Sequence, residues 1–334
     1  MLHVTVIAPR HACDAAVRAI DADPTTSDVA VVRGAARDGE ADLLMFDVAR
    51  ENANTVIDEL RALGIAESGS ITLTEPLAII SREADDAEAA ADGSPSDGVV
   101  WAQIEEQARG DSRMSWSYVI FLVLACLIAS VGRYLDQPIL IIGAMVVGPE
   151  FAPIAAMCVA LARGRGSLIL PSVGTLLGGF AIGAAVTWLL WIVVYSLGWV
   201  TRAGVVDGPL TEFIVKPDVW SFVIALLAGV AGVLSLTTAK SSTLVGVFIS
   251  ITTVPAVGTI GMTVAVGAWD EALASLVQLG LNLGGLLVAG TATLLLQSLV
   301  WRMRHGSGGP PSRSMARWQR SRRSASSSRR SALS

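Results

Sequence analysis

Long stretches without a charged side chain are the feature that most limits how this chain can fold. A helix needs about 20 apolar residues to cross the ~30 Å hydrocarbon core of a bilayer. Five stretches have no Asp, Glu, Lys or Arg, at 114–132, 166–201, 219–239, 241–269 and 272–301, and a sixth, 137–162, has only Glu150. They predict an α-helical polytopic membrane protein with about six transmembrane helices. The predicted spans are 115–134, 138–162, 168–198, 219–238, 242–268 and 272–301.

The charges are distributed very unevenly along the 334 residues. Residues 1–115 hold 9 Lys and Arg against 22 Asp and Glu, residues 116–301 hold 6 against 7, and residues 302–334 hold nine arginines and no acid. The chain is 52% hydrophobic and 16% charged, whereas soluble domains are about a quarter charged. The expected parts are a domain at 1–80, an acidic linker with a juxtamembrane helix at 81–114, a membrane domain at 115–302 and a disordered basic tail at 303–334.

The first 80 residues have the pattern of a small α/β domain. Alternating apolar residues indicate strands, and apolar residues at helical spacing indicate helices. The resulting order, βαββαβ, is typical of a ferredoxin-like domain, which we expect either to bind a regulatory ligand or to serve only in assembly. The expected strands are 2–8, 29–34, 42–49 and 70–74, and the expected helices are 12–22 and 52–63.

Residues 82–98 are acidic and rich in Ala, Gly, Ser and Pro, which favours a linker. Residues 99–113 are expected to form an amphipathic helix at the membrane surface, with Trp101 and Ile104 on one side. The arginine-rich tail is expected to hold anionic lipid headgroups, and nucleic acid is not an expected partner.

Basic residues near the spans give the orientation. With an even number of spans both termini lie on one side, and the positive-inside rule favours cytoplasmic termini in a plasma (inner) membrane. The predicted outer loops hold Arg133, Arg202 and Lys216; Arg133 and Asp136 are expected to pair at the outer surface. Aromatic residues near span ends are expected at the membrane interface: Trp116, Tyr118, Trp199, Trp220 and Trp301.

The membrane part has a doubled pattern that favours two halves of three spans. Gly143 precedes Pro153 by ten positions, and Gly246 precedes Pro255 by nine. Each proline-broken span is followed by a long, glycine-rich one. Because three spans per half is an odd number, a repeat would be inverted in the membrane, which is an arrangement found in secondary transporters. Ordinary proline kinks are the alternative, and the pattern leaves both interpretations open.

The broken spans supply the candidate ion or solute site. Proline removes a backbone N–H and clashes with the preceding turn, so backbone carbonyls near Pro149 and Pro153 lose their partners. Pro255 creates the same situation beside Thr252 and Thr253. Unpaired backbone within a bilayer is tolerated only where protein or water satisfies it. Free carbonyls and threonine hydroxyls can bind a cation or a polar solute.

Glu150 is the only acidic residue well inside an apolar stretch. A charge at mid-membrane costs about 2.5–3.5 kcal/mol on insertion scales, and such residues usually serve in ion or proton movement. The alternative is that Glu150 lies at an interface or caps a half-helix.

Gln278 and Asn282 lie four apart on one helix face and are weaker candidates, for solute binding or for bonding between helices. GxxxG spacings permit close helix approach and are compatible with a homo-oligomer. We expect them mainly to pack spans within the bundle; they are Gly174/Gly178, Gly179/Gly183 and Gly280/Gly284.

No motif for chemistry is visible. The sequence has no GxxxxGK[ST] loop, no HExxH and no GxSxG. His3, His11 and His305 lie outside the predicted spans. The sequence therefore predicts no enzyme, no cofactor and no metal site.

The segment ILIIGAMVVGPEFAPIAAMCVALARG (139–164) resembles the hallmark of a hydrophobic membrane family, domain of unknown function 389. Many members have an apolar residue in place of Glu150. The resemblance covers roughly residues 110–300, and the N-terminal domain is similar to one in some members. It implies a multi-pass membrane protein without an established substrate. The matching residues are Gly143, Ala144, Met145, Pro149, Pro153 and Ile154.

The sequence leaves two functions open. The first is a secondary transporter or channel-like protein for a small ion or solute, with a regulatory cytoplasmic domain. The second is a non-transporting membrane sensor or scaffold whose N-terminal domain binds a ligand or partner.

Overall fold

The computed structural model describes residues 1–37, 39–93, 98–216, 218–238 and 253–305. The chain divides into two compact units. One comprises Met1–Pro95 with the segment from Leu296, and the other comprises Ser96–Leu295.

The N-terminal unit contains a four-stranded antiparallel sheet with the order β2-β3-β1-β4. Leu2, Val4 and Val6 alternate with more exposed residues along β1 and are fully buried. They contribute to a core with buried residues of α1 and α2, which pack against each other. The predicted βαββαβ order is present, with a short extra helix, α3, before the last strand. The elements are β1 (Leu2–Pro9), α1 (Arg10–Ile20), β2 (Thr26–Val32), β3 (Ala41–Val48), α2 (Ala53–Ala62), α3 (Ile65–Ser68) and β4 (Ser70–Thr74).

The acidic segment after the sheet is a helix, not a linker as expected. Helix α4 (Arg82–Ala90) begins after Ser81, whose hydroxyl accepts a hydrogen bond from the backbone N–H of Ala84 at 3.4 Å. This is an N-cap, and acidic residues in the first turn favour the helix further. Ala84 and Ala87 are buried, and α4 packs against β2 and β3.

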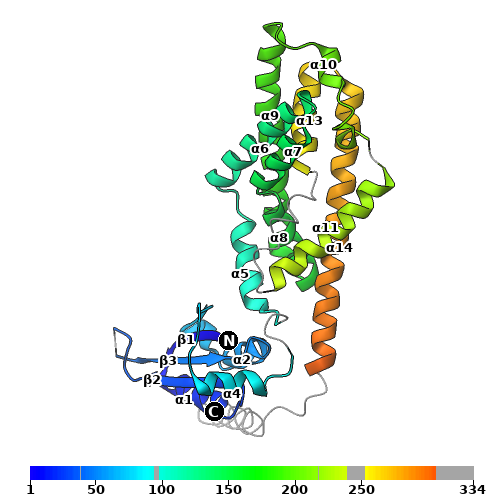
Figure 1. Cartoon of the computed structure of the whole chain (residues 1–334). Coiled ribbons are helices and arrows are strands. Elements are labelled where there is room, and N and C mark those ends of the chain that lie inside the picture. The colour runs from blue at the N-terminus through cyan, green and yellow to red at the C-terminus, as the bar shows by residue number, and fades with distance from the viewer. Residues whose placement is uncertain (38, 94–97, 217, 239–252, 306–334) are drawn as a thin grey trace, which may run out of the picture. The chain divides into compact units, whose positions relative to one another are not determined.

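The second unit is entirely helical in its described residues (Figure 1). Helices α6, α9 and α13 pack against one another, and α7 packs against α6. The elements are α5 (Trp101–Asp111), α6 (Trp116–Tyr134), α7 (Pro138–Val147), α8 (Phe151–Arg163), α9 (Gly166–Ser196), α10 (Arg202–Val206), the 3₁₀ helix η2 (Glu212–Ile214), α11 (Val219–Thr237), α13 (Thr253–Ala265) and α14 (Trp269–His305), of which the residues from Leu296 are counted with the first unit.

Four helices in the described residues are long and apolar enough to cross a membrane, namely α6, α9, α11 and most of α14. The pair α7 and α8 raises the number to five if it forms one bent span. Helix α13 is apolar but shorter, and the predicted fifth span, 242–268, lies partly outside the described residues. Six spans and an inverted repeat are therefore not established.

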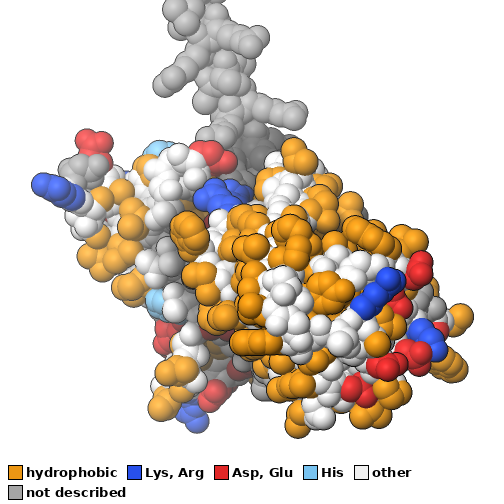
Figure 2. Space-filling view, turned by 90° about the horizontal axis from the view of Figure 1, so that it is seen from above, with side chains coloured by type: hydrophobic (Ala, Val, Ile, Leu, Met, Phe, Trp, Pro, Cys, Tyr) orange, Lys and Arg blue, Asp and Glu red, His pale blue; other side chains and the backbone are white. Residues whose placement is uncertain are grey.

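Large apolar side chains are exposed on the outside of the long helices, including Phe121, Leu189, Leu227 and Leu276. Figure 2 shows hydrophobic side chains across much of one face of the molecule, with acidic and basic side chains mostly around its margins. Exposed apolar surface of this extent fits a lipid environment. The bundle therefore has the character of a membrane protein.

Glycines allow several of these helices to approach closely. A side chain at Gly258 of α13 would meet the Cys126 carbonyl oxygen of α6 at 2.5 Å. Two of the predicted GxxxG glycines, Gly179 and Gly183, similarly lie against α6. In contrast, a side chain at Gly280 or Gly284 would meet no atom within 4 Å, so this pair does not pack helices within the described bundle.

Candidate functional site

A buried carboxylate lies at the break between α7 and α8. The two helices are bent by 56° across Gly148, Pro149 and Glu150. Glu150 is 2% exposed. Its Oε1 accepts a hydrogen bond from the Thr253 hydroxyl at 3.0 Å, whereas its Oε2 has no hydrogen-bond partner among the described residues. The break therefore places an acidic group inside the bundle with only part of its hydrogen bonding satisfied.

The two prolines expected to interrupt spans both lie in helices of the described chain. Pro153 is the third residue of α8, and Pro255 lies in α13, two positions after Thr253, where the described part of that helix begins. The first N–H groups of a helix have no acceptor within it, so proline is tolerated in the first turn. Pro153 therefore lies near a helix start. We call Gly148–Glu150 together with Thr253 and Val254 the α8–α13 junction.

Gly148 lies at a closely packed point of this junction. A Cβ atom at Gly148 would lie 2.3 Å from the Glu150 Oε2 and 2.9 Å from the Val254 Cγ2. Neither distance is compatible with normal contact. The absence of a side chain thus leaves the space that the Glu150 carboxylate fills.

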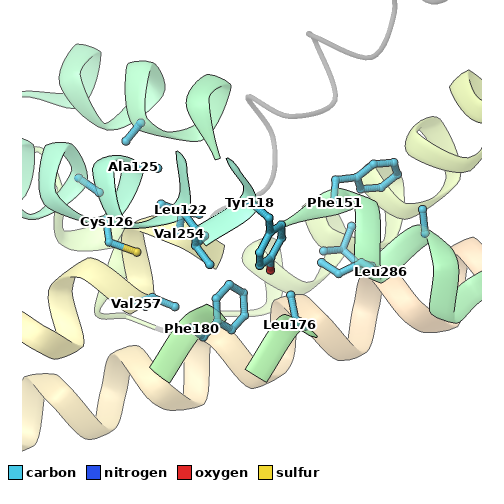
Figure 3. Close-up of a cluster of buried hydrophobic side chains, with 14 of the residues drawn as sticks. Tyr118, Leu122, Ala125, Cys126, Phe151, Leu176, Phe180, Val254, Val257 and Leu286 are labelled. Atoms are coloured by element: carbon cyan, nitrogen blue, oxygen red, sulfur yellow. The ribbon is translucent and has the colours of Figure 1, made fainter. Parts of the chain in front are cut away.

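An apolar cluster includes Val254 of the junction and Phe151, which follows Glu150 (Figure 3). Tyr118 and Leu122 of α6, Phe151 of α8, Val254 of α13 and Leu286 of α14 all belong to it. The Tyr118 hydroxyl is buried and has no partner among the described residues. Tyr118 is 8% exposed, so the expectation of an interfacial tyrosine is wrong. Its place in the first turn of a span resembled that of an interfacial anchor.

Gln278 and Asn282 lie together at the wall of a separate pocket. The Gln278 Nε2 donates a hydrogen bond to the Asn282 Oδ1 at 3.5 Å, while the Gln278 Oε1 is buried without a partner in the described chain. The pocket has a volume of about 210 Å³ and lies between α11 and α14. Its lining includes Ala228 and Leu286, which also belong to the apolar cluster around the junction.

The remaining predicted site residues do not join the junction. Gly143 is exposed on α7, and a side chain there would meet no atom within 4 Å. Thr252 lies outside the described residues. No group of three or more His, Cys, Asp or Glu suited to a metal ion occurs in the described part of the chain.

The juxtamembrane helix α5 is tied to the end of α8 and to the loop that follows it. The Glu105 carboxylate accepts hydrogen bonds from Arg163 Nε at 2.9 Å and from Arg165 Nη2 at 2.8 Å. The Arg163 guanidinium also lies 5.0 Å from the ring centre of Trp101. Burial raises the pKa of Glu105, but the two arginines together outweigh burial and the net shift is downward.

Apolar contacts reinforce this attachment of α5. Trp101 and Ile104 are buried against Cys158 of α8, Val233 of α11 and Leu294 of α14. The helix expected at 99–113 is confirmed, but these two side chains pack against the bundle and do not lie free at a membrane surface.

A family comparison covers the junction and the pocket. Residues 145–288 match the model of a family described as "Domain of unknown function (DUF389)". That part of the chain is similar to this family. The matched range runs from α7 into α14 and includes Gly148, Glu150, Thr253, Gln278 and Asn282. The resemblance expected from residues 139–164 is thus confirmed.

One curated relative is an uncharacterized protein of Methanocaldococcus jannaschii. It is 27% identical over 174 residues, which is 52% of this chain and 51% of that protein. The alignment therefore covers about half the length of each.

Proposed function

We propose that the protein is a secondary transporter or channel-like protein for a small ion or solute, centred on the α8–α13 junction. The observation that carries this proposal is the buried Glu150 carboxylate at a break in an apolar helix pair, bonded to Thr253 of a second short helix. An acidic group within apolar helices is costly and usually serves ion or proton movement. Paired helix breaks are the usual position of such sites in secondary transporters.

The similar placement of two prolines supports the finer parts of this proposal. Pro153 follows Glu150 by three positions and Pro255 follows Thr253 by two, and Glu150 and Thr253 are joined by a hydrogen bond. We propose on this basis a six-span domain built as an inverted 3+3 repeat. The pocket at Gln278 and Asn282 would serve as an approach to the junction, because Leu286 belongs both to its lining and to the cluster around Glu150.

The proposal extends to the surroundings of the membrane domain. We place both termini in the cytoplasm at the plasma (inner) membrane, with the basic tail on anionic lipids. The N-terminal unit would be a ferredoxin-like regulatory domain, and the protein would act without catalysing a reaction. The contact of Glu105 with Arg163 and Arg165 links α5, the helix that precedes the first span, to the end of α8.

The test is ion flux in sealed proteoliposomes containing the full chain. Gradients of protons, sodium, potassium and chloride are imposed one at a time, and flux is followed with a pH dye, a potential dye and ion-selective electrodes. The wild type is expected to exceed empty vesicles for at least one ion, and Glu150→Gln is expected to change that flux. Glu106→Gln is the matched control, since the Glu106 side chain is 76% exposed on α5.

Absence of flux for all four ions, from protein shown to be folded, would count against ion transport. The remaining candidate would then be the sensor or scaffold, and ligands of the N-terminal unit would be sought.

A further inference from the structure

The pocket between α11 and α14 lies beside the point where these two helices cross (Figure 1). A side chain at Gly285 of α14 would meet the Ala225 Cβ at 2.8 Å, and one at Gly229 of α11 would meet the Leu286 carbonyl oxygen at 2.8 Å. The helices are thus in close contact at the crossing. The pocket has a volume of about 210 Å³, equal to roughly seven water molecules at ~30 Å³ each. It can therefore hold only a small ligand.

The α14 side of the pocket carries two amide side chains one helical turn apart. Gln278 is 1% exposed, and its Nε2 donates a hydrogen bond to the Asn282 Oδ1 at 3.5 Å. The Gln278 Oε1 is buried and has no partner among the described residues. Buried polar groups are almost always hydrogen-bonded to protein, water or a ligand. A hydrogen-bond donor is therefore missing at Gln278, and a ligand in the pocket can supply it.

The α11 side of the pocket carries a carboxylate and two aromatic rings. Asp218 lies just before α11, and its Oδ1 accepts a hydrogen bond from the Ser221 backbone N–H at 2.7 Å. The hydrogen bonds from Ser221 lower the pKa of Asp218, so this carboxylate is ionised at neutral pH. Phe213 and Trp220 belong to the same lining. Faces of aromatic rings attract cations, so these groups favour a positively charged ligand.

The charge of the lining disfavours an anion. Among the described residues that line the pocket, Asp218 is acidic and none is Lys, Arg or His. Lys216, two positions before Asp218, forms an ion pair with Glu212. Much of the remaining lining is apolar and includes Ile224 and Leu286.

A metal cation fits this lining less well than an organic one. Hard metal ions take several oxygen ligands, usually with more than one carboxylate. The described chain offers no group of three or more His, Cys, Asp or Glu suited to a metal. An organic ammonium ion combines the features that the lining calls for, because it has a positive charge, N–H donors and an apolar part.

We propose that the pocket between α11 and α14 is a binding site for a small primary organic ammonium ion. Its N–H groups would donate to the Gln278 Oε1, Asp218 would provide the compensating negative charge, and its alkyl part would pack on the apolar lining. The inference goes beyond the proposed transport function, because such binding does not require that the ligand crosses the bilayer.

Binding is tested on the purified full-length protein in detergent with probes of similar size. The probes are n-butylammonium chloride, n-butanol and sodium butyrate, and potassium chloride represents a simple metal cation; sodium chloride keeps the ionic strength equal. Binding is followed by isothermal titration calorimetry and by thermal unfolding, since ligands that bind the folded state raise its unfolding temperature. Butylammonium is expected to bind and to stabilise the wild type, whereas the other three probes are not.

Two substitutions remove the groups that would recognise the ligand. Asp218→Asn removes the charge but keeps a residue that can begin α11, because Asn is also a good N-cap. Gln278→Met keeps the length of the side chain and removes the acceptor. Each is expected to weaken butylammonium binding about tenfold or more. Asp270→Asn is the matched control and should bind as the wild type does, because Asp270 is an exposed acid in the first turn of α14 and does not line the pocket.

The possible outcomes separate the pocket from the proposed transport site. Equal stabilisation by butylammonium and butanol, unchanged in Asp218→Asn, would overturn the proposal and indicate a cavity that takes any apolar chain, including that of a lipid. Binding that is lost in Glu150→Gln but kept in Asp218→Asn would place the cation at the α8–α13 junction and overturn the pocket site.

The absence of butylammonium binding to folded wild type would also overturn the pocket site, and ion flux in proteoliposomes would still test transport. Binding that depends on Asp218 and Gln278, in a protein without flux, would support the pocket site and count against transport. If Gln278→Met fails to fold, the comparison of Asp218→Asn with Asp270→Asn decides the proposal.

Discussion

Arg133 Nη1 donates a hydrogen bond to the Thr211 hydroxyl at 2.9 Å, although the two residues are 78 positions apart. The same hydroxyl donates to the Asp136 Oδ1 at 2.9 Å. Arg133 also donates to the carbonyls of Gly208 and Val206. Arg133 is 2% exposed, so it is not half of an outer surface pair with Asp136, as expected. Both residues instead hold the segment between α10 and η2 against the end of α6.

Arg133→Met is expected to loosen this segment. It removes a buried charged donor and leaves the carbonyls of Val206 and Gly208 without that partner, at a cost of about 3 kcal/mol. The variant should unfold at a lower temperature and be cut faster by protease between 202 and 214. Arg202→Met is the control, because Arg202 is exposed on α10. Equal cleavage of both variants would contradict a positioning role for Arg133.

Gly148→Ala is expected to disturb the α8–α13 junction, whereas Gly143→Ala is not. The new methyl group at 148 would lie 2.3 Å from the Glu150 Oε2, and relieving this overlap should cost about 1–3 kcal/mol. A methyl group at 143 meets nothing and replaces a helical glycine, so it should be neutral or stabilising by up to about 1 kcal/mol. Thermal unfolding of the two purified proteins in detergent makes the comparison. Similar losses in both would show that Gly148 has no special role.

Sequence reasoning could predict the members of the site better than their pairing. Glu150 stands out because it is the acidic residue in an apolar stretch, and Pro153 and Pro255 because they interrupt such stretches. The contact between Glu150 and Thr253 joins residues 103 positions apart, and no local pattern specifies it. Gly148 and Tyr118 depend on the same tertiary packing. The only local sign that Gly148 belongs to the site is that it precedes Pro149, and this sign is weak.

The fold shows the same division between local and long-range information. The strands of the N-terminal unit follow from alternation, which burial along β1 reproduces. The acidic composition of residues 82–98 favoured a linker where helix α4 lies. Ser81 before Glu83 and Asp85 is nevertheless a helix-start signal. The buried position of Arg133 could not be foreseen, because its partners come from a loop far along the chain.

Glu105→Gln is expected to weaken the attachment of α5 in a pH-dependent way. The pKa of Glu105 lies below its ordinary value of 4.5 because the two arginines outweigh burial. Its stabilising contribution is therefore fully present above about pH 4.5 and is lost as the pH falls through the lowered pKa. The wild type should exceed Glu105→Gln in unfolding temperature at neutral pH, and the difference should shrink in acid.

Glu106→Gln provides the control for this pH series. Glu106 is exposed, and its Oε2 lies 3.5 Å from the Nε of Arg109 on the same helix. Surface ion pairs of this kind contribute little to the free energy of unfolding. Its variant should follow the wild type at every pH. A gap between wild type and Glu105→Gln that stays constant down to strongly acidic pH would show that the arginine contacts do not stabilise the ionised form.

Thr253→Val and Thr253→Ser separate the shape of Thr253 from its hydroxyl. Valine keeps the branched shape but removes the donor to the Glu150 Oε1, while serine keeps the donor and removes a methyl group. Because Glu150 is buried, loss of the hydrogen bond that it accepts from Thr253 should cost about 1.5–3 kcal/mol. Thr253→Val should therefore unfold at a lower temperature than Thr253→Ser. The difference in unfolding temperature should be smaller when both variants also carry Glu150→Gln, because a neutral amide needs the donor less than a carboxylate does. This double-variant comparison isolates the coupling between the two residues. If valine and serine have the same effect in both backgrounds, the hydrogen bond does not stabilise the carboxylate.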